Sequence, residues 1–267
     1  MSLSDFVKSY EKHFKELAYR LRRVAIVLFI SLLLMLSLPA SALNPETFMS
    51  GLYTPLSVYL VNMIASSVLS SPFMKNSSII FIAGHLSMGF EIWFSASLFF
   101  SLLITIPVLI HELWKFVEPG LYEHEKRTLR RIFLPVLGSF VFGCLFGFFI
   151  LVPIILRTFI AINLWFNVQP IITYADFIHF IVSTIIFSGA FMTTPIIVYG
   201  LILIGVLPVD SLLKYRIPLY IGIYVVAAII TPDGGCFGSA ILATPIICLF
   251  ELVLQLGKRK KGKELRK

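Results

Sequence analysis

The strongest constraint in this sequence is a series of six apolar stretches, each bounded by polar, proline or glycine residues of the kind that end helices. They cover residues 24–43, 92–113, 132–156, 177–206, 217–230 and 239–256. A bilayer core about 30 Å thick is crossed by about 20 helical residues, and only the last two stretches fall short of that length. The pattern predicts an all-α integral membrane protein with six transmembrane helices, the last two short.

Composition excludes an ordinary soluble protein. Of the 267 residues, 58% are apolar and only 13% are charged, whereas a soluble domain has about 45–50% apolar and about 25% charged residues. The basic pI near 9.4 would fit a nucleic-acid-binding protein. However, the basic residues gather in short runs beside apolar stretches, so we expect a lipid bilayer and no nucleic acid as their surroundings.

The basic residues also predict orientation. All but two of the 22 lysines and arginines lie in the N-terminal segment, in alternate loops and in the C-terminal tail; the exceptions are Lys75 and Arg157. This asymmetry predicts a multi-pass protein of the cytoplasmic (inner) membrane, with both termini in the cytoplasm. We expect one membrane domain over 1–267, made of an amphipathic surface helix (1–23), the six-helix bundle (24–256) and a basic tail (257–267).

A cleaved secretory signal is an alternative interpretation of the N-terminal region, because small residues follow Pro39 in an A-x-A pattern. The basic segment before the first apolar stretch is 23 residues long and amphipathic, unlike the short basic region of such signals, so the membrane-helix interpretation is favoured. Residues 55–71, in the first outer loop, are apolar enough to form a helical cap on the outer bilayer surface.

Enzymatic motifs are missing from the sequence. There is no GxxxxGK[ST] phosphate-binding loop, no HExxH zinc motif and no metal-binding cysteine spacing. The sequence therefore predicts neither an enzyme nor a cofactor or metal site. Two alternatives stay open: an intramembrane serine protease using Ser239 and His179, and a small-solute secondary transporter using Glu251, with Glu91 as a second acid.

The informative charges are two acids on the strongly basic side, Glu16 and Glu125. The helical neighbours of Glu125 at i±3 and i±4 include no cation, so its carboxylate is available to an incoming guanidinium, which can form two parallel hydrogen bonds with it. The alternative is a solvated acid stabilised by the helix dipole. For Glu16 the alternative is local pairing with Lys12 and Arg20 at i±4.

Several segments resemble one protein family. Residues 13–21, HFKELAYRL, are similar to the amino-terminal HLxELRxR element of the TatC family, the large subunit of the twin-arginine protein translocase. Residues 114–127, WKFVEPGLYEHEKR, resemble its WxFxxPGLxxxEK/R signature. The likeness continues at Thr231-Pro232-Asp233 and at Pro245 with Phe250-Glu251, so it covers nearly the whole chain.

The resemblance implies six helices in a concave bundle and a receptor for twin-arginine signal peptides of folded precursor proteins, which cross the membrane using the proton gradient. It also implies homo- and hetero-oligomers with single-span subunits of the TatA and TatB kind. The signal-peptide residues implied by the family pattern are Glu16, Arg20, Phe116, Pro119, Leu121, Tyr122 and Glu125. Pro55, Thr193 and Asp233 match positions with a structural or partner-contact role.

Two positions depart from the family pattern. Ala18 replaces the first arginine of ELRxR, which leaves Arg20 as the remaining basic scaffold beside Glu16. Thr193 stands where the family usually has Glu or Gln, before the proline of the fourth stretch. Because threonine cannot carry charge, its role is either a hydrogen bond to a partner helix or a hydrogen bond back to its own helix near the proline kink.

Overall fold

The computed structural model describes residues 3–40, 54–74, 79–117, 123–231 and 236–264. The chain forms two compact units. The first contains residues 1–61 and 89–123, and the second contains residues 62–88 and 124–267.

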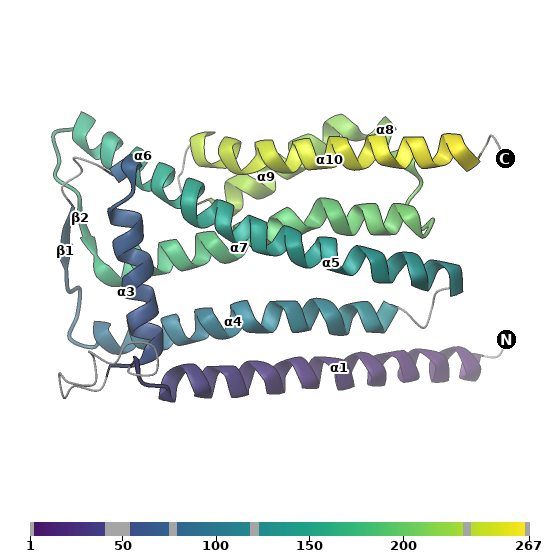
Figure 1. Ribbon diagram of the computed structural model, residues 1–267, viewed down its shortest axis with the longest axis horizontal. Helices are drawn as coiled ribbons and strands as arrows, with labels where there is room; N and C mark the ends of the chain where they lie inside the picture. Colours follow the sequence, from purple (N-terminus) through teal and green to yellow (C-terminus); the bar gives the residue numbers. More distant parts are fainter. Residues whose placement is uncertain (1–2, 41–53, 75–78, 118–122, 232–235, 265–267) are drawn as a thin grey trace. The chain divides into compact units, whose positions relative to one another are not determined.

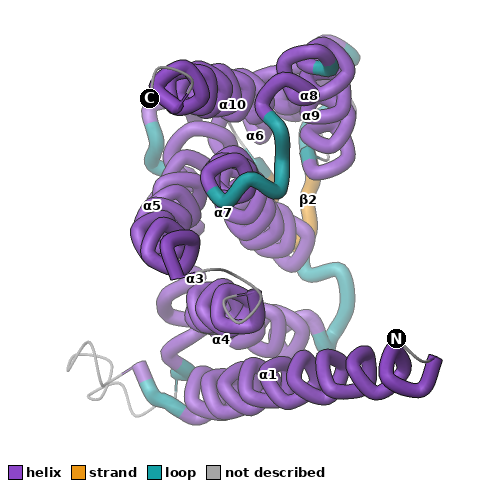
Figure 2. The backbone as a smooth tube through the Cα atoms, turned by 90° about the vertical axis from the view of Figure 1, so that its right-hand side faces the viewer, coloured by secondary structure: helices purple, strands orange, loops and turns teal. Residues whose placement is uncertain are grey.

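The first unit is built from α1 (Leu3–Ser37), the first turns of α3 (Leu56–Leu69) and α4 (Met88–Val117). Helices α1 and α4 lie side by side (Figures 1 and 2). The chain leaves α1 just before Pro39, and a short antiparallel bridge joins Pro39 to Pro55. The amide of Ala40 donates to the carbonyl of Thr54 at 2.8 Å, which fixes the start of α3 against the end of α1.

In the second unit, α5 (Glu123–Phe146), one π-helical segment (Gly147–Leu151) and α6 (Val152–Trp165) follow one another without a loop. Pro153 lacks a backbone donor near the start of α6, and such a gap is often accommodated by a wider π turn. Helix α7 (Tyr174–Leu203) begins at a Thr173 cap, whose hydroxyl oxygen accepts from the Asp176 amide at 3.2 Å.

The remaining elements complete this unit. Helices α8 (Val209–Lys214), α9 (Arg216–Ile230) and α10 (Cys236–Glu264) follow α7, and α10 packs against both α7 and α9 (Figure 2). A 3-10 turn (Pro72–Met74) precedes strand β1 (Ile80–Ile82), which pairs in parallel with β2 (Ile171–Thr173) in the register Ile80 to Ile171.

The core of the second unit is apolar and closely packed. Met192, Ala227, Leu242 and Ile246, from α7, α9 and α10, are fully buried in one cluster. At the crossing of α5 and α7, a Cβ atom added to Gly143 would lie 2.8 Å from both the Gly189 Cα and the Ser188 carbonyl oxygen. The missing side chain therefore allows the two backbones to approach closely, as in many membrane helix pairs.

The membrane-protein prediction is confirmed. Among the described residues, four helical segments are long and apolar enough to cross a bilayer: Met88–Phe116, Arg130–Trp165, Tyr174–Leu203 and Phe237–Arg259. Helix α9 is short, as predicted, with 15 residues. The helix expected within residues 55–71 is also present, as α3.

Three features differ from the sequence-based expectation. Residues 3–37 form one continuous helix instead of a separate surface helix followed by a membrane helix, because no glycine or proline interrupts them. Helix α10 has 29 residues because the basic segment after Gly257 continues its helix to Glu264. The β1–β2 pair was not predicted, since three-residue strands leave little periodicity to detect.

Candidate functional site

The candidate site is an ion network between α1 and α4, in the first unit. Glu16, Arg20 and Arg23 follow one another on α1 at spacings of four and three residues, so their side chains share one face of that helix. Glu112 comes from the last turns of α4, 92 residues away from Arg20 along the chain. Two carboxylates and two guanidiniums therefore meet where these helices pass each other.

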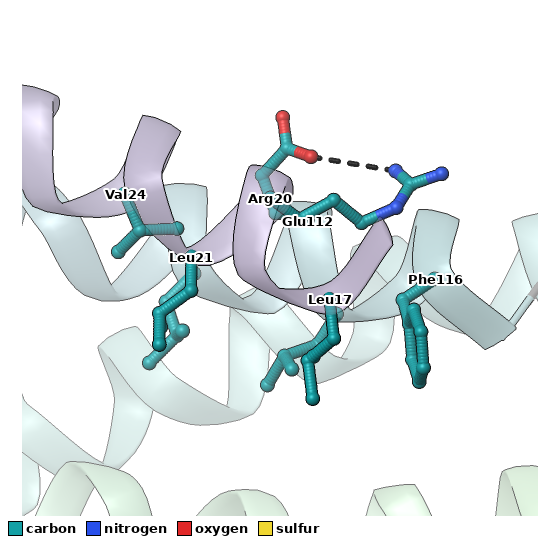
Figure 3. Close-up of a pocket in the computed structure, with 8 residues that line it drawn as sticks. Leu17, Arg20, Leu21, Val24, Glu112 and Phe116 are labelled. Carbon is teal, nitrogen blue, oxygen red and sulfur yellow. Dashed lines mark hydrogen bonds and ion pairs between the residues drawn. The ribbon is translucent and has the colours of Figure 1, made fainter. Parts of the chain in front are cut away.

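Arg20 is the central residue of this network. Its Nε and Nη2 atoms both donate to Glu16 Oε1, at 3.2 and 2.7 Å. Its Nη1 atom donates to Glu112 Oε2 at 3.4 Å (Figure 3). One guanidinium thus links a carboxylate of its own helix to a carboxylate of the neighbouring helix.

Arg23 reaches Glu112 from the other side. Its Nη1 atom lies 3.6 Å from Glu112 Oε1, which is an ion pair without a hydrogen bond. Its Nη2 atom donates to the Tyr19 hydroxyl at 3.0 Å, and its guanidinium lies 4.6 Å from the centre of the Tyr19 ring. The hydrogen bond to Tyr19 raises the pKa of Arg23, so this guanidinium stays charged.

Burial differs between the two acids. The Glu112 side chain is only 11% exposed, whereas that of Glu16 is 32% exposed. A buried carboxylate loses its hydration and needs good hydrogen bonds in exchange. Glu112 therefore depends more strongly on its arginine partners than Glu16 does.

A small apolar pocket lies beside the ion network. Figure 3 shows Leu17, Leu21 and Phe116 gathered below the Arg20–Glu112 pair; Val24, Leu109 and Leu113 complete the lining. The space is only about 10 Å³, the room for about one water molecule, so these side chains chiefly pack α1 against α4 beside the ion pairs.

The structure brings three of the predicted signal-peptide residues together: Glu16, Arg20 and Phe116 all belong to this region. The local alternative for Glu16 is seen in part, since Arg20 pairs with it. Residues Pro119, Leu121 and Tyr122 lie outside the described residues. Glu125 lies in α5, but its side chain is also outside the described part.

The other predicted positions lie elsewhere. Pro55 directly precedes α3 and forms the bridge to Pro39. Thr193 is buried in α7, and its hydroxyl donates to the carbonyl of Ala190 at 2.6 Å, which is the hydrogen bond back to its own helix. Asp233 lies outside the described residues.

Glu112 is the residue that sequence reasoning missed. It lies inside the second apolar stretch, near its end, and no local spacing links it to α1. A sequence signal nevertheless existed, because a carboxylate within a membrane stretch is costly and needs a partner.

Glu251 and Ser239, which were named for the two alternative functions, the transporter and the serine protease, lie in the second unit. Glu251 accepts a hydrogen bond from the Tyr220 hydroxyl, between α10 and α9. Ser239 is fully buried in α10. Within the described part of the chain, no three His, Cys, Asp or Glu side chains lie close enough together to hold a metal ion.

Comparison with known proteins identifies the family. The family model described as Sec-independent protein translocase protein (TatC) matches residues 12–245. The Aquifex aeolicus protein of that name is 30% identical over 64% of this chain and 72% of its own length. The Escherichia coli K12 protein is 29% identical over 61% of this chain and 62% of its own length.

A solved structure shares the fold. The crystal structure of a twin-arginine translocase receptor, TatC, superposes with a TM-score of 0.71, at 25% identity, over 92% of this chain and 98% of that chain. Together with the family match over nearly the whole length, this likeness explains the apolar helices and the absence of enzymatic motifs. The chain therefore belongs to the TatC family and is a multi-pass, non-enzymatic membrane subunit of the twin-arginine protein translocase.

Proposed function

We propose that this subunit is the receptor that binds twin-arginine signal peptides at the cytoplasmic face of the inner membrane. It assembles with single-span TatA- and TatB-like subunits, and folded precursor proteins cross with energy from the proton gradient. Its N- and C-termini lie in the cytoplasm, in agreement with the distribution of lysines and arginines.

The proposal rests on one observation, which is how the Glu16 carboxylate accepts its hydrogen bonds. Both hydrogen bonds that Arg20 donates to Glu16 end on the same oxygen, Oε1. Among contacts between described side chains, Glu16 Oε2 accepts no hydrogen bond, and the side chain is about one third exposed. Arg20 thus holds Oε1 of the carboxylate, and we infer that a guanidinium from outside is accepted at Oε2, in place of any contact from the Lys12 side chain, which lies outside the described part of the chain.

The first turn of α5 supplies the second acid in this proposal. Glu125 has no basic neighbour at helical spacing, and it follows the family signature in residues 114–127. Two acids at an otherwise basic membrane surface would favour a peptide carrying two adjacent guanidiniums, because each carboxylate can form a bidentate pair. Phe116, Pro119, Leu121 and Tyr122 would shape the surface beside them.

The test is to measure the affinity of the purified protein, in lipid nanodiscs, for a labelled twin-arginine signal peptide. We expect Glu125→Ala, Glu125→Lys and Glu16→Gln each to weaken binding at least roughly tenfold, as the loss of a charge-assisted pair implies. Glu91→Gln, at the opposite end of α4, is the matched control and should bind like the wild type.

Correct insertion must be shown for every variant, by size-exclusion profile and by protease protection of the termini. Unchanged affinity in both Glu125 variants and in Glu16→Gln would reject the receptor proposal. A loss that appears equally in Glu91→Gln would also reject it, because the effect would then reflect total charge instead of this site.

A further inference from the structure

The ion network contains one carboxylate whose partners are both held more tightly elsewhere. Arg20 lies 3.4 Å from Glu112 but 2.7 Å from Glu16. Arg23 lies 3.6 Å from Glu112 but donates to Tyr19 at 3.0 Å. Glu112 is therefore the weakest-bound member of the network, although it is the more buried of the two acids.

This combination makes Glu112 ready to exchange partners. Hydrogen bonds between guanidinium and carboxylate groups are usually about 2.7–2.9 Å long, so both contacts of Glu112 are longer than such bonds. Arg23 is the more exposed member of its pair with Glu112, with half of its side chain exposed. When Arg23 leaves Glu112, Arg23 keeps its hydrogen bond and its ring contact with Tyr19, and Glu112 keeps its contact with Arg20 until the arriving guanidinium binds.

We propose that Glu112 is a further acceptor for a guanidinium of the export signal, and that Arg20 and Arg23 occupy it as internal substitutes until the peptide arrives. An arriving arginine replaces Arg23 at Glu112 and forms the short hydrogen bonds that the resident arginines do not form. The side chains of Leu17, Leu21 and Phe116 beside the pair offer an apolar surface to the residue next to that arginine. This inference rests on the proposed receptor function and adds a residue and a competition step to it.

The exchange predicts opposite effects for the two members of one ion pair. Glu112→Gln keeps the shape of the side chain but removes its charge, so it should weaken binding of a twin-arginine peptide by roughly tenfold. Arg23→Gln removes the internal competitor and should strengthen binding by roughly threefold. A network that only braces α1 against α4 would be damaged by both substitutions and would give losses in both.

Arg22→Gln is the control for Arg23→Gln. Arg22 is its exposed neighbour on α1 and has no place in the described ion network. Both substitutions remove one positive charge near the site, so a general electrostatic gain for a cationic peptide appears in both. The exchange predicts that Arg23→Gln strengthens binding more than Arg22→Gln does.

The experiment is a fluorescence-anisotropy titration of each full-length variant in nanodiscs with a labelled Arg-Arg peptide and its Lys-Lys counterpart. A loss in Glu112→Gln together with the excess gain in Arg23→Gln supports the proposal. If Glu112→Gln fails to insert, the comparison of Arg23→Gln with Arg22→Gln decides alone.

Unchanged affinity in Glu112→Gln, or losses in both Glu112→Gln and Arg23→Gln, would overturn the proposal while the receptor function stands, provided that the wild type prefers the Arg-Arg peptide. Equal binding of both peptides by the wild type would overturn the receptor function and this inference together.

Discussion

Helices α1 and α4 meet through charges, whereas α7, α9 and α10 meet through a continuous apolar core. In the first pair, Arg20 and Arg23 of α1 contact Glu112 of α4 at 3.4 and 3.6 Å. In the second group, Met192 and Ile246 are completely buried. The comparison suggests that one region keeps a single arrangement, while the other contains pairs that can be exchanged.

The physical reason lies in the two environments. Inside a bilayer, apolar side chains gain little by leaving lipid for protein, so helices hold together through close backbone approach and well-fitted side chains. Such packing leaves no alternative arrangement of similar energy. The ion pair of Arg23 with Glu112 has one half-exposed member, and such a charge can turn to water or to another partner at small cost.

The largest loss of stability is expected when a side-chain atom is added at the crossing of α5 and α7. Gly143→Ala places a Cβ 2.8 Å from the backbone of α7, so one helix must move, at a cost of about 1–3 kcal/mol of stability. Thermal unfolding in detergent, followed by circular dichroism, measures this loss. Gly138→Ala is the matched control in α5, because an added Cβ there meets nothing within 4 Å.

An unfolding temperature for Gly143→Ala that equals that of Gly138→Ala would show that the crossing of α5 and α7 adjusts easily. The contrast between the two regions would then be lost.

The ion network should contribute less to stability than this crossing. Arg20→Gln breaks the contacts to both Glu16 and Glu112 and leaves the more buried acid with Arg23 alone, so we expect a loss of about 1–2 kcal/mol. In 1 M salt the contribution of the more exposed Glu16 contact should shrink, whereas that of the buried Glu112 contact should change little. Arg22→Gln, measured in the same unfolding assay, provides the reference.

A loss in Arg20→Gln larger than that in Gly143→Ala would reverse the comparison. It would show that α1 and α4 depend on charge for their fold and not only for the exchange of partners.

One hydrogen bond between α9 and α10 tests whether the apolar core alone holds these helices together. Tyr220 donates to Glu251 between α9 and α10, and Tyr220→Phe removes only that hydroxyl. Hydrogen bonds between membrane helices contribute about 0.6 kcal/mol on average, so the loss should be small because the surrounding apolar core remains. Tyr215→Phe, an exposed tyrosine directly before α9, is the control. A loss of several kcal/mol would mean that this pair, and not the apolar cluster, holds α9 to α10.

The smallest loss of stability is expected when the hydrogen bond between Ser97 and Ser57 is removed. The Ser97 hydroxyl lies 2.8 Å from that of Ser57, linking α4 to α3, and both side chains are buried. Ser97→Ala should cost about 0.5 kcal/mol in the same assay. Ser67→Ala, an exposed serine that bonds to its own helix, should be neutral. Complete loss of inserted protein in Ser97→Ala would contradict this estimate.

The sequence was sufficient for the membrane fold because apolar length and helix-ending residues are local signals. The i,i+4 spacing of Glu16 and Arg20 offers their pairing only as the alternative to signal-peptide binding, and that pair is present. The change from an amphipathic to an apolar pattern predicts two helices where α1 is one, because no residue breaks the helix between them. Glu112 was missed because its partners lie about 90 residues away, and spacing along the chain carries no information about such contacts.

The central claim is that carboxylates at the inner surface select guanidinium groups and not merely positive charge. The most direct measurement is the affinity of the wild-type protein in nanodiscs for two signal peptides that differ only in having Arg-Arg or Lys-Lys. Because lysine cannot form the bidentate pair, we predict at least roughly tenfold tighter binding of the Arg-Arg peptide, persisting at 0.15 M salt. Equal affinities for the two peptides would contradict the account.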